Sequence, residues 1–229
     1  MDQLYVIWIP AVVAALIMAS FSMPVSLMTL LTHNILGHEQ HKSKLTSYSL
    51  FYLCGAILAL GLLIFLALAL ASLPIFQTDQ RYRWSLYSLL IIDGLFVLLF
   101  YYRSDRGTRL WLPRKTAVNL TKSVEEVGSG GDVFLSGGLS IFAELLLTIV
   151  PIFVAAVALN KLGYPDSLYA GIGYIFVALL PVIILILANA AGQKISKFQR
   201  FREKNKVFFQ IASGVLMIVL GIYLLIVNR

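Results

Sequence analysis

Two carboxylates, Asp93 and Glu144, stand inside long apolar stretches of the chain, and either transport or close packing could explain them; Gly94 beside Asp93 indicates packing there. Asp93 and Glu144 each lie nine or ten residues into a predicted membrane helix, near the bilayer centre. An ionised carboxylate at that depth costs at least about 2.5 kcal/mol. Because the predicted spans contain no Lys, Arg or His, each acid is expected to be protonated or balanced by a cation or cationic substrate. The pattern favours proton or cation transport, and the structural alternative is a protonated acid bonded to a neighbouring helix.

Hydroxyl groups accompany these acids. Ser140 and Thr148 lie four residues either side of Glu144, on the same helical face, where they could bond a ligand or the acid. In the first apolar segment Ser20, Ser22 and Ser26 surround Pro24 and could line the same cavity. Serines that bond back to their own helix are the alternative there.

The helices that position these residues are predicted from composition and apolar runs. Of 229 residues, 59% are hydrophobic and 13% charged. The apolar runs are long enough to cross about 30 Å of hydrocarbon as helices, and too uniformly apolar for barrel strands. We predict an all-α integral membrane protein with six transmembrane helices, over residues 4–31, 48–73, 84–102, 134–159, 169–191 and 207–227.

Basic residues predict the orientation. Fourteen of the 18 Lys and Arg residues fall in the first, third and fifth loops, which the positive-inside rule assigns to the cytoplasm. Both termini are therefore expected outside the cytoplasm, with the chain in the inner (plasma) membrane. The net charge of +7 is then explained by topology and by anionic lipids at the cytoplasmic loops, and no nucleic-acid partner is expected.

The predicted helices divide into two groups of three. Residues 1–102 form the first repeat, 103–133 a cytoplasmic linker and 134–229 the second repeat. An odd number of crossings would insert the second repeat upside down, as in many secondary transporters. Each repeat begins with a helix that contains a proline, Pro24 or Pro151, where a break could lie beside a substrate site. Packing alone explains either proline equally well.

The loops and small residues are assigned structural roles. We expect a headgroup-level segment over residues 109–120, a flexible hinge over residues 125–132 and a basic surface anchor in the fifth loop. Small residues predict close helix packing; they are Gly55, Ala59, Gly171, Gly214 and Gly221.

Metal and thiol chemistry have little support. His33, His38 and His41 lie with Glu39 in the first loop, a weak candidate for metal sensing or delivery. A thiol relay needs two sulfurs, and Cys54 is the single cysteine, so we interpret it as a packing residue. No cofactor is implied.

This arrangement resembles the lysine-exporter superfamily, which includes the CcdA proteins and the transmembrane part of DsbD. The resemblance covers most of the chain and is carried by Ser-Met-Pro at residues 22–24, the second triplet, and a last helix with Gly214 and Gly221. It implies a small inverted-repeat transporter of the inner membrane. The Pro-Cys motifs of CcdA are absent, because Val25 follows Pro24 and the fourth span has no cysteine. The Pro-Gly-Pro of amino-acid exporters is also missing.

Three functions remain open. The first is a secondary transporter, an exporter of a small or cationic solute that is proton- or cation-coupled through Glu144 and Asp93. The second is a thiol-less, CcdA-like scaffold or assembly factor for a partner membrane protein; a homo-oligomer is also compatible. An enzyme is not expected, because the chain has no paired nucleophile and base and no phosphate-binding loop.

Overall fold

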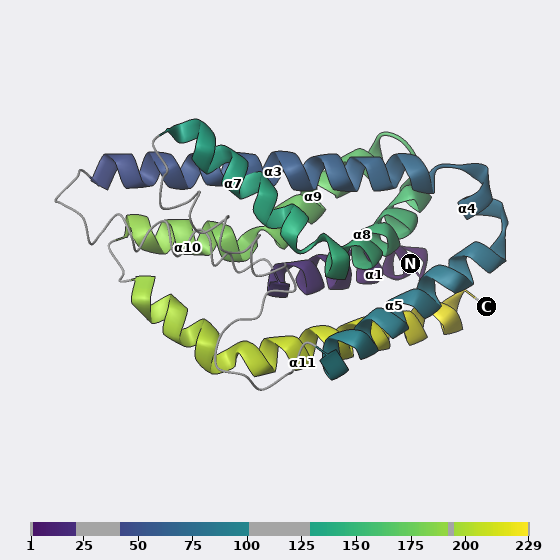
Figure 1. The fold of residues 1–229 in the computed structure, drawn as a ribbon. Coiled ribbons are helices and arrows are strands. Elements are labelled where there is room, and N and C mark those ends of the chain that lie inside the picture. The colour runs from purple at the N-terminus through teal and green to yellow at the C-terminus, as the bar shows by residue number, and fades with distance from the viewer. Residues whose placement is uncertain (1, 22–41, 101–128, 192–194, 229) are drawn as a thin grey trace.

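Every element of the described chain is a helix. A computed structural model describes residues 2–21, 42–100, 129–191 and 195–228, and these ranges contain no strand. Figure 1 shows the helices, which are α1 (Asp2–Phe21), α3 (Lys42–Ala71), α4 (Pro74–Thr78), α5 (Gln80–Phe100), α7 (Gly130–Ala143), α8 (Leu145–Leu159), the 3₁₀ turn η1 (Asn160–Leu162), α9 (Asp166–Ala178), α10 (Leu180–Ala190) and α11 (Ile195–Val227).

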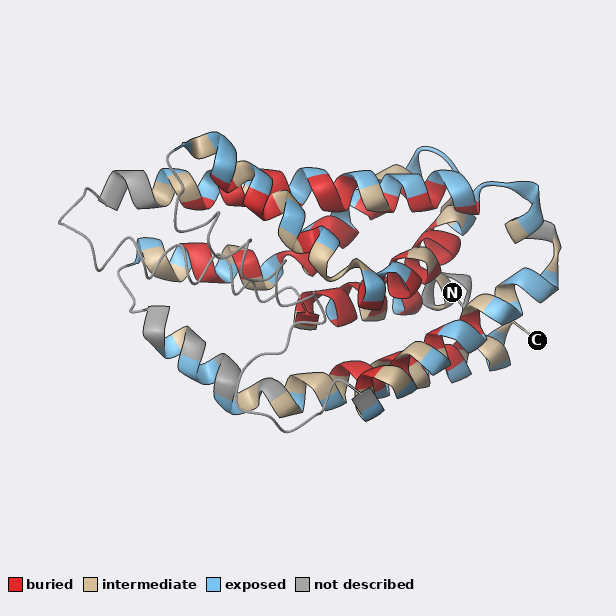
Figure 2. Cartoon of the chain, viewed as in Figure 1, coloured by how far each residue is buried: buried red, intermediate tan, exposed pale blue. Residues whose placement is uncertain are grey.

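Several of these helices are long and apolar enough to cross a bilayer. Four qualify singly, over Thr46–Ala71, Gln80–Leu99, Leu145–Leu162 and Val207–Val227, and the bent pair α9 and α10 would make a fifth. Their outer surfaces carry large apolar side chains, with Leu62 62% and Leu99 71% exposed. Figure 2 shows this exposed surface along the outside of α3 and α11, with the buried residues facing inward. Apolar surface of that extent requires a lipid or protein neighbour, and the chain is therefore an all-α protein with four to five candidate membrane spans.

The helices pack side by side around α8. Helix α8 contacts α1, α3 and α5, while α3 also lies along α7 and α5 lies along α11. In Figure 1, α1 begins and α11 ends at the same end of the bundle. The buried core between them is almost wholly apolar, with Ile17, Leu60 and Leu90 fully enclosed.

The structure confirms some predicted spans and lengthens others. The predictions over residues 48–73 and 84–102 match α3 and α5, although α5 already begins at Gln80. The prediction over residues 4–31 matches α1 as far as Phe21, and the remainder lies outside the described residues. The prediction of a loop in the basic segment before residue 207 is wrong from Ile195 onward, because α11 is a continuous helix there. Lys, Arg, Glu and Gln favour helix, and no Gly or Pro interrupts them.

The fourth and fifth predicted spans are each divided in two. The segment predicted as one span over residues 134–159 is broken at Glu144, between α7 and α8. The break does not coincide with Pro151, which lies buried inside α8. The segment predicted as one span over residues 169–191 bends by 52° between α9 and α10. That bend follows from Pro181 in the first turn of α10, since proline lacks an N–H and excludes the preceding turn from regular helix.

The end of the predicted hinge is also helical. Ser129 caps α7, with its hydroxyl accepting from Asp132 N at 3.4 Å while Asp132 Oδ2 accepts from Ser129 N at 3.2 Å. This reciprocal capping box satisfies first-turn N–H groups. The hinge prediction is therefore wrong for residues 130–132, and residues 125–128 lie outside the described chain.

Glycines let helix backbones touch, as their positions predicted. A Cβ added to Gly55 in α3 would overlap the Phe134 carbonyl of α7, and one added to Gly137 would overlap the Tyr52 carbonyl. A Cβ added to Gly214 would come within 2.7 Å of the Leu98 side chain of α5. Cys54, in contrast, is exposed, so its interpretation as a residue that packs within the bundle is wrong.

Candidate functional site

Glu144 lies at the junction of two helices. Its backbone (φ −96°, ψ −1°) ends α7 and begins α8, and its N–H donates to Ile141 O at 3.2 Å, three residues back. Its carbonyl accepts from Leu147 N at 3.1 Å and from the Thr148 hydroxyl at 3.0 Å. The regular pattern of bonds four residues apart is therefore interrupted at the acid itself.

The contacts of α7 with α3 indicate how deep this junction lies. A Cβ on Gly130 would meet Phe51, and one on Gly138 would lie 3.8 Å from Ala59 Cβ, so the two helices run in the same direction. Six further residues, about 9 Å of helix rise, place Glu144 roughly level with Phe65. That level is inside the apolar span Thr46–Ala71, away from both of its ends.

The hydroxyl groups beside Glu144 donate hydrogen bonds to backbone carbonyls. Ser140 Oγ donates to Gly137 O at 2.7 Å, and the buried Thr148 Oγ1 donates to Glu144 O. Neither donates its proton to the carboxyl group. Both oxygens can still accept a hydrogen bond, so they suit a donor ligand better than an anionic one.

The carboxyl of Glu144 is half-buried at this junction, with its Oε2 atom fully enclosed. Helix α8, which begins at this residue, lies against α1, α3 and α5. The acid therefore stands where one helix enters the centre of the bundle, beside an irregular piece of backbone.

Asp93 lies on the edge of the face that α5 turns to its neighbours. Its side chain is half-buried, and Oδ2 is enclosed with no hydrogen-bond partner in the described ranges. The next residue, Gly94, is buried where a Cβ would come within 2.8 Å of Gly214 O. Helix α5 contacts α11 and α8, and Gly94 faces α11. Asp93 and Glu144 therefore lie on different helices, and the contacts of Gly94 do not bring the two acids together.

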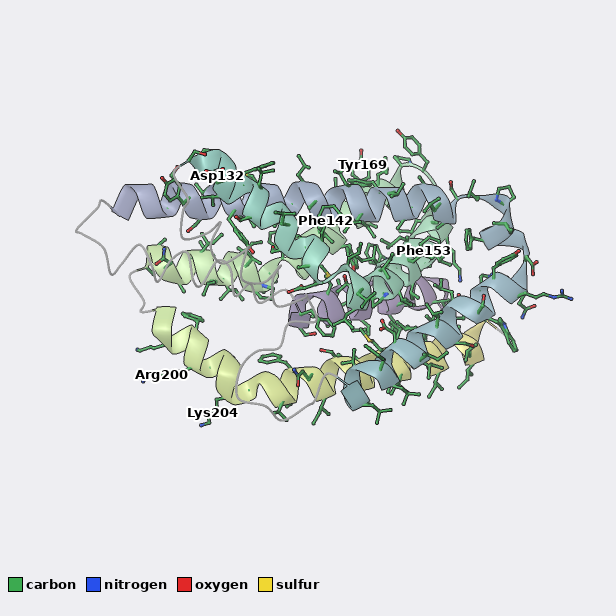
Figure 3. The ribbon with its side chains drawn as sticks, in the orientation of Figure 1. Asp132, Phe142, Phe153, Tyr169, Arg200 and Lys204 are labelled. Atoms are coloured by element: carbon green, nitrogen blue, oxygen red, sulfur yellow. The ribbon has the colours of Figure 1, made fainter. Side chains whose placement is uncertain are left out.

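The basic residues of α5 lie near its start, away from Asp93. Because α5 begins at Gln80, it contains Arg81 and Arg83, and the expectation of spans without basic residues is wrong for this helix. Ten residues, about 15 Å of helix rise, separate Arg83 from Asp93. The basic side chains of α11 labelled in Figure 3, Arg200 and Lys204, extend outward from its first part.

The predicted serine lining of the first helix is only partly described. Ser20 of α1 donates to Ile17 O and shares a hydrogen bond of 2.5 Å with Ser213 of α11, so it joins two helices. Ser213 was not singled out by sequence reasoning, although its place beside Gly214 marks it as a contact residue. The remaining candidates lie outside the described residues; they are Ser22, Pro24, Ser26, His33, His38 and His41.

Sequence reasoning also missed Tyr174 of α9. Its side chain is 4% exposed, and its hydroxyl is enclosed without a hydrogen-bond partner in the described part of the chain. Neighbouring Gly171 and Ile175 face Leu68 and Gly61 of α3. Tyr174 thus lies near the level of α3 that Glu144 reaches, and only the presence of a hydroxyl in an apolar run could have marked it.

The described residues hold carboxyl, hydroxyl and backbone groups in an apolar bundle. Within residues 2–21, 42–100, 129–191 and 195–228, no three His, Cys, Asp or Glu side chains gather as a metal site. No protein-family model, curated protein or solved structure matches the chain.

Proposed function

We propose that the chain is a six-pass secondary transporter of the inner membrane, a divergent member of the lysine-exporter superfamily that exports a small or cationic solute. Glu144 is the proton or cation site, and Asp93 is a second acid. The observation that carries the proposal is the break in the fourth pass, which falls at an acidic residue deep in the bundle.

A broken helix is useful to a transporter because it frees backbone groups at membrane depth. Such irregular backbone is tolerated where it is buried in protein or lines a cavity, and discontinuous helices often form ion and substrate sites. At Glu144 the carboxylate supplies negative charge, while Ser140 and Thr148 supply hydroxyl oxygens that can accept. This set of acceptors favours a proton or a positively charged ligand.

The packing pattern supports six passes in two inverted repeats. If α7 with α8, and α9 with α10, each make one pass, then α1, α3 and α5 correspond to α7–α8, α9–α10 and α11. A two-fold axis between such triplets makes their contacts reciprocal, so a second helix that touches the other triplet's first helix must be matched by the reverse contact. Helix α1 contacts α8, α5 contacts α11, α3 contacts α7 and α8, and α9 contacts α1.

The charge distribution supports an orientation with both termini outside the cytoplasm. Asn228 lies beside Gln80 and Lys161, at the sparsely basic end of the bundle. The basic start of α11 belongs to the other end, where anionic lipids would meet it.

Alternating access follows from this arrangement. Rocking one triplet against the other would expose Glu144 to each side in turn, and the acid would exchange a proton or release a cation at each face. The bend before Pro181 and the break at Glu144 are the two places where the second triplet can flex without breaking a regular helix.

The test is proton flux in proteoliposomes that contain the purified full chain and an internal pH-sensitive dye. Candidate cationic solutes are added outside, and a solute that drives proton movement identifies coupling. Glu144→Gln should abolish that movement. Asp166→Asn is the matched control, because Asp166 is exposed in the first turn of α9.

Unchanged coupling in Glu144→Gln would remove the acid from the mechanism. If no solute moves in any screen and a stoichiometric membrane partner co-purifies, the scaffold hypothesis replaces transport.

A further inference from the structure

A polar cluster joins three helix ends at the end of the bundle that contains Asn228. Lys161 Nζ, in the turn after α8, donates to Asn228 Oδ1 at 3.0 Å. Gln80 Nε2, at the start of α5, donates to Asn228 O at 3.3 Å. The ends of α8 and α11 and the start of α5 therefore meet around one residue.

Two positive charges belong to this end of the bundle. Arg83 lies three residues after Gln80 on α5, and Gln80 and Lys161 bond the same residue, Asn228; the positive charge of Arg83 also acts on Lys161. The Nε atom of Arg83 is enclosed and has no hydrogen-bond acceptor in the described residues. An enclosed N–H without an acceptor is costly, because it loses its hydrogen bond to water and gains none in return.

Arg81 offers a comparison on the same helix. Only two residues away, it is exposed, whereas Arg83 is half-buried. An arginine that merely extends to water keeps its head group solvated. Arg83 instead has its Nε enclosed, on the helix whose first residue joins the polar cluster at Asn228, and an anionic ligand there would supply the missing acceptor.

We propose that Arg83 and Lys161, with Gln80 beside them, bind the phosphate of an anionic ligand at this end of the bundle. An arginine matches phosphate with paired N–H donors, and a lysine adds a second charge. Arg83 is the fourth residue of the span Gln80–Leu99, so it lies at the depth of lipid head groups. The phosphate can belong to an anionic lipid or be free in solution, and the site is independent of Glu144 and of transport.

The test uses the purified, delipidated full chain in neutral detergent and measures its thermal unfolding and its bound lipid by native mass spectrometry. Phosphatidylglycerol, phosphatidylcholine and inorganic phosphate are titrated separately. The variants are Arg83→Gln and Lys161→Gln, with Arg81→Gln as the matched control of the same charge change.

Binding by a lipid predicts that phosphatidylglycerol binds wild type and Arg81→Gln alike, and that both site variants weaken it at least tenfold. Binding of a free anion predicts the same order with inorganic phosphate. Equal affinity in all four proteins would overturn the proposal for both sources. If Arg83→Gln fails to fold, the exposed Lys161 decides the outcome, since its replacement removes little packing.

Discussion

A close approach of two helix backbones, between α3 and α7, gives a sharp test of the fold. Gly55→Ala places a Cβ 2.9 Å from the Phe134 carbonyl carbon and still closer to its oxygen. Because the obstacle is backbone, no side chain can rotate away. The two helices must separate, by about 1 Å or more, for the contact to reach an ordinary van der Waals distance.

The expected cost follows from two opposing effects. Overpacking of this kind costs about 3 kcal/mol, the upper part of the usual range, because both backbones must move. Alanine is the better helix former and returns about 1 kcal/mol. Gly55→Ala should therefore destabilise the protein by about 2 kcal/mol, and Gly137→Ala, which meets the Tyr52 carbonyl, should do the same.

The control is Gly173→Ala in α9, where a Cβ meets nothing within 4 Å. It should leave stability unchanged or raise it by up to about 1 kcal/mol. Unfolding by SDS in mixed micelles, followed by circular dichroism, measures all three variants. If Gly55→Ala and Gly173→Ala unfold at the same SDS fraction, the close approach of α3 and α7 is wrong.

Other contacts lead to further predictions. Ser20→Ala and Ser213→Ala should show a coupling of about 0.6 kcal/mol in a double-mutant cycle, typical of hydrogen bonds between membrane helices; strictly additive effects would contradict the bond between α1 and α11. Ser129→Ala should cost about 1 kcal/mol and speed amide exchange in the first turn of α7; unchanged exchange there would contradict the capping box. Pro181→Ala should reduce the 52° bend, seen as a longer distance between spin labels on exposed faces of α9 and α10; an unchanged distance would show that packing alone holds the bend.

The positions of the helices could be predicted from the sequence because a bilayer imposes a length and an apolar composition. Helices α3 and α5 follow directly from these constraints. The break at Glu144 could not be predicted, since neither Gly nor Pro stands there. The interruption depends on which N–H and O–H groups donate to the Glu144 carbonyl, and the sequence does not determine that. The bend at Pro181 and the capping box at Ser129 had local signals, a proline within a span and an acidic residue three positions after a serine.

The candidate site was predictable to a similar extent. The two acids stand out because ionisable side chains are rare in apolar spans, and the structure describes both as half-buried. Their surroundings depend on rotamers and on neighbouring helices. Thr148 illustrates this. Its spacing from Glu144 would allow an interaction with the carboxyl group, yet its hydroxyl donates to the backbone carbonyl of Glu144, four residues before it.

Helix α11 runs unbroken from Ile195 to Val227, well past the apolar span that begins at Val207. Figure 1 shows that the first, basic part of α11 bends away from the direction of its apolar part, while the chain stays helical through the change of direction. A ligand that binds the basic turns would therefore hold the same helix that carries Ser213, the residue bonded to Ser20 of α1.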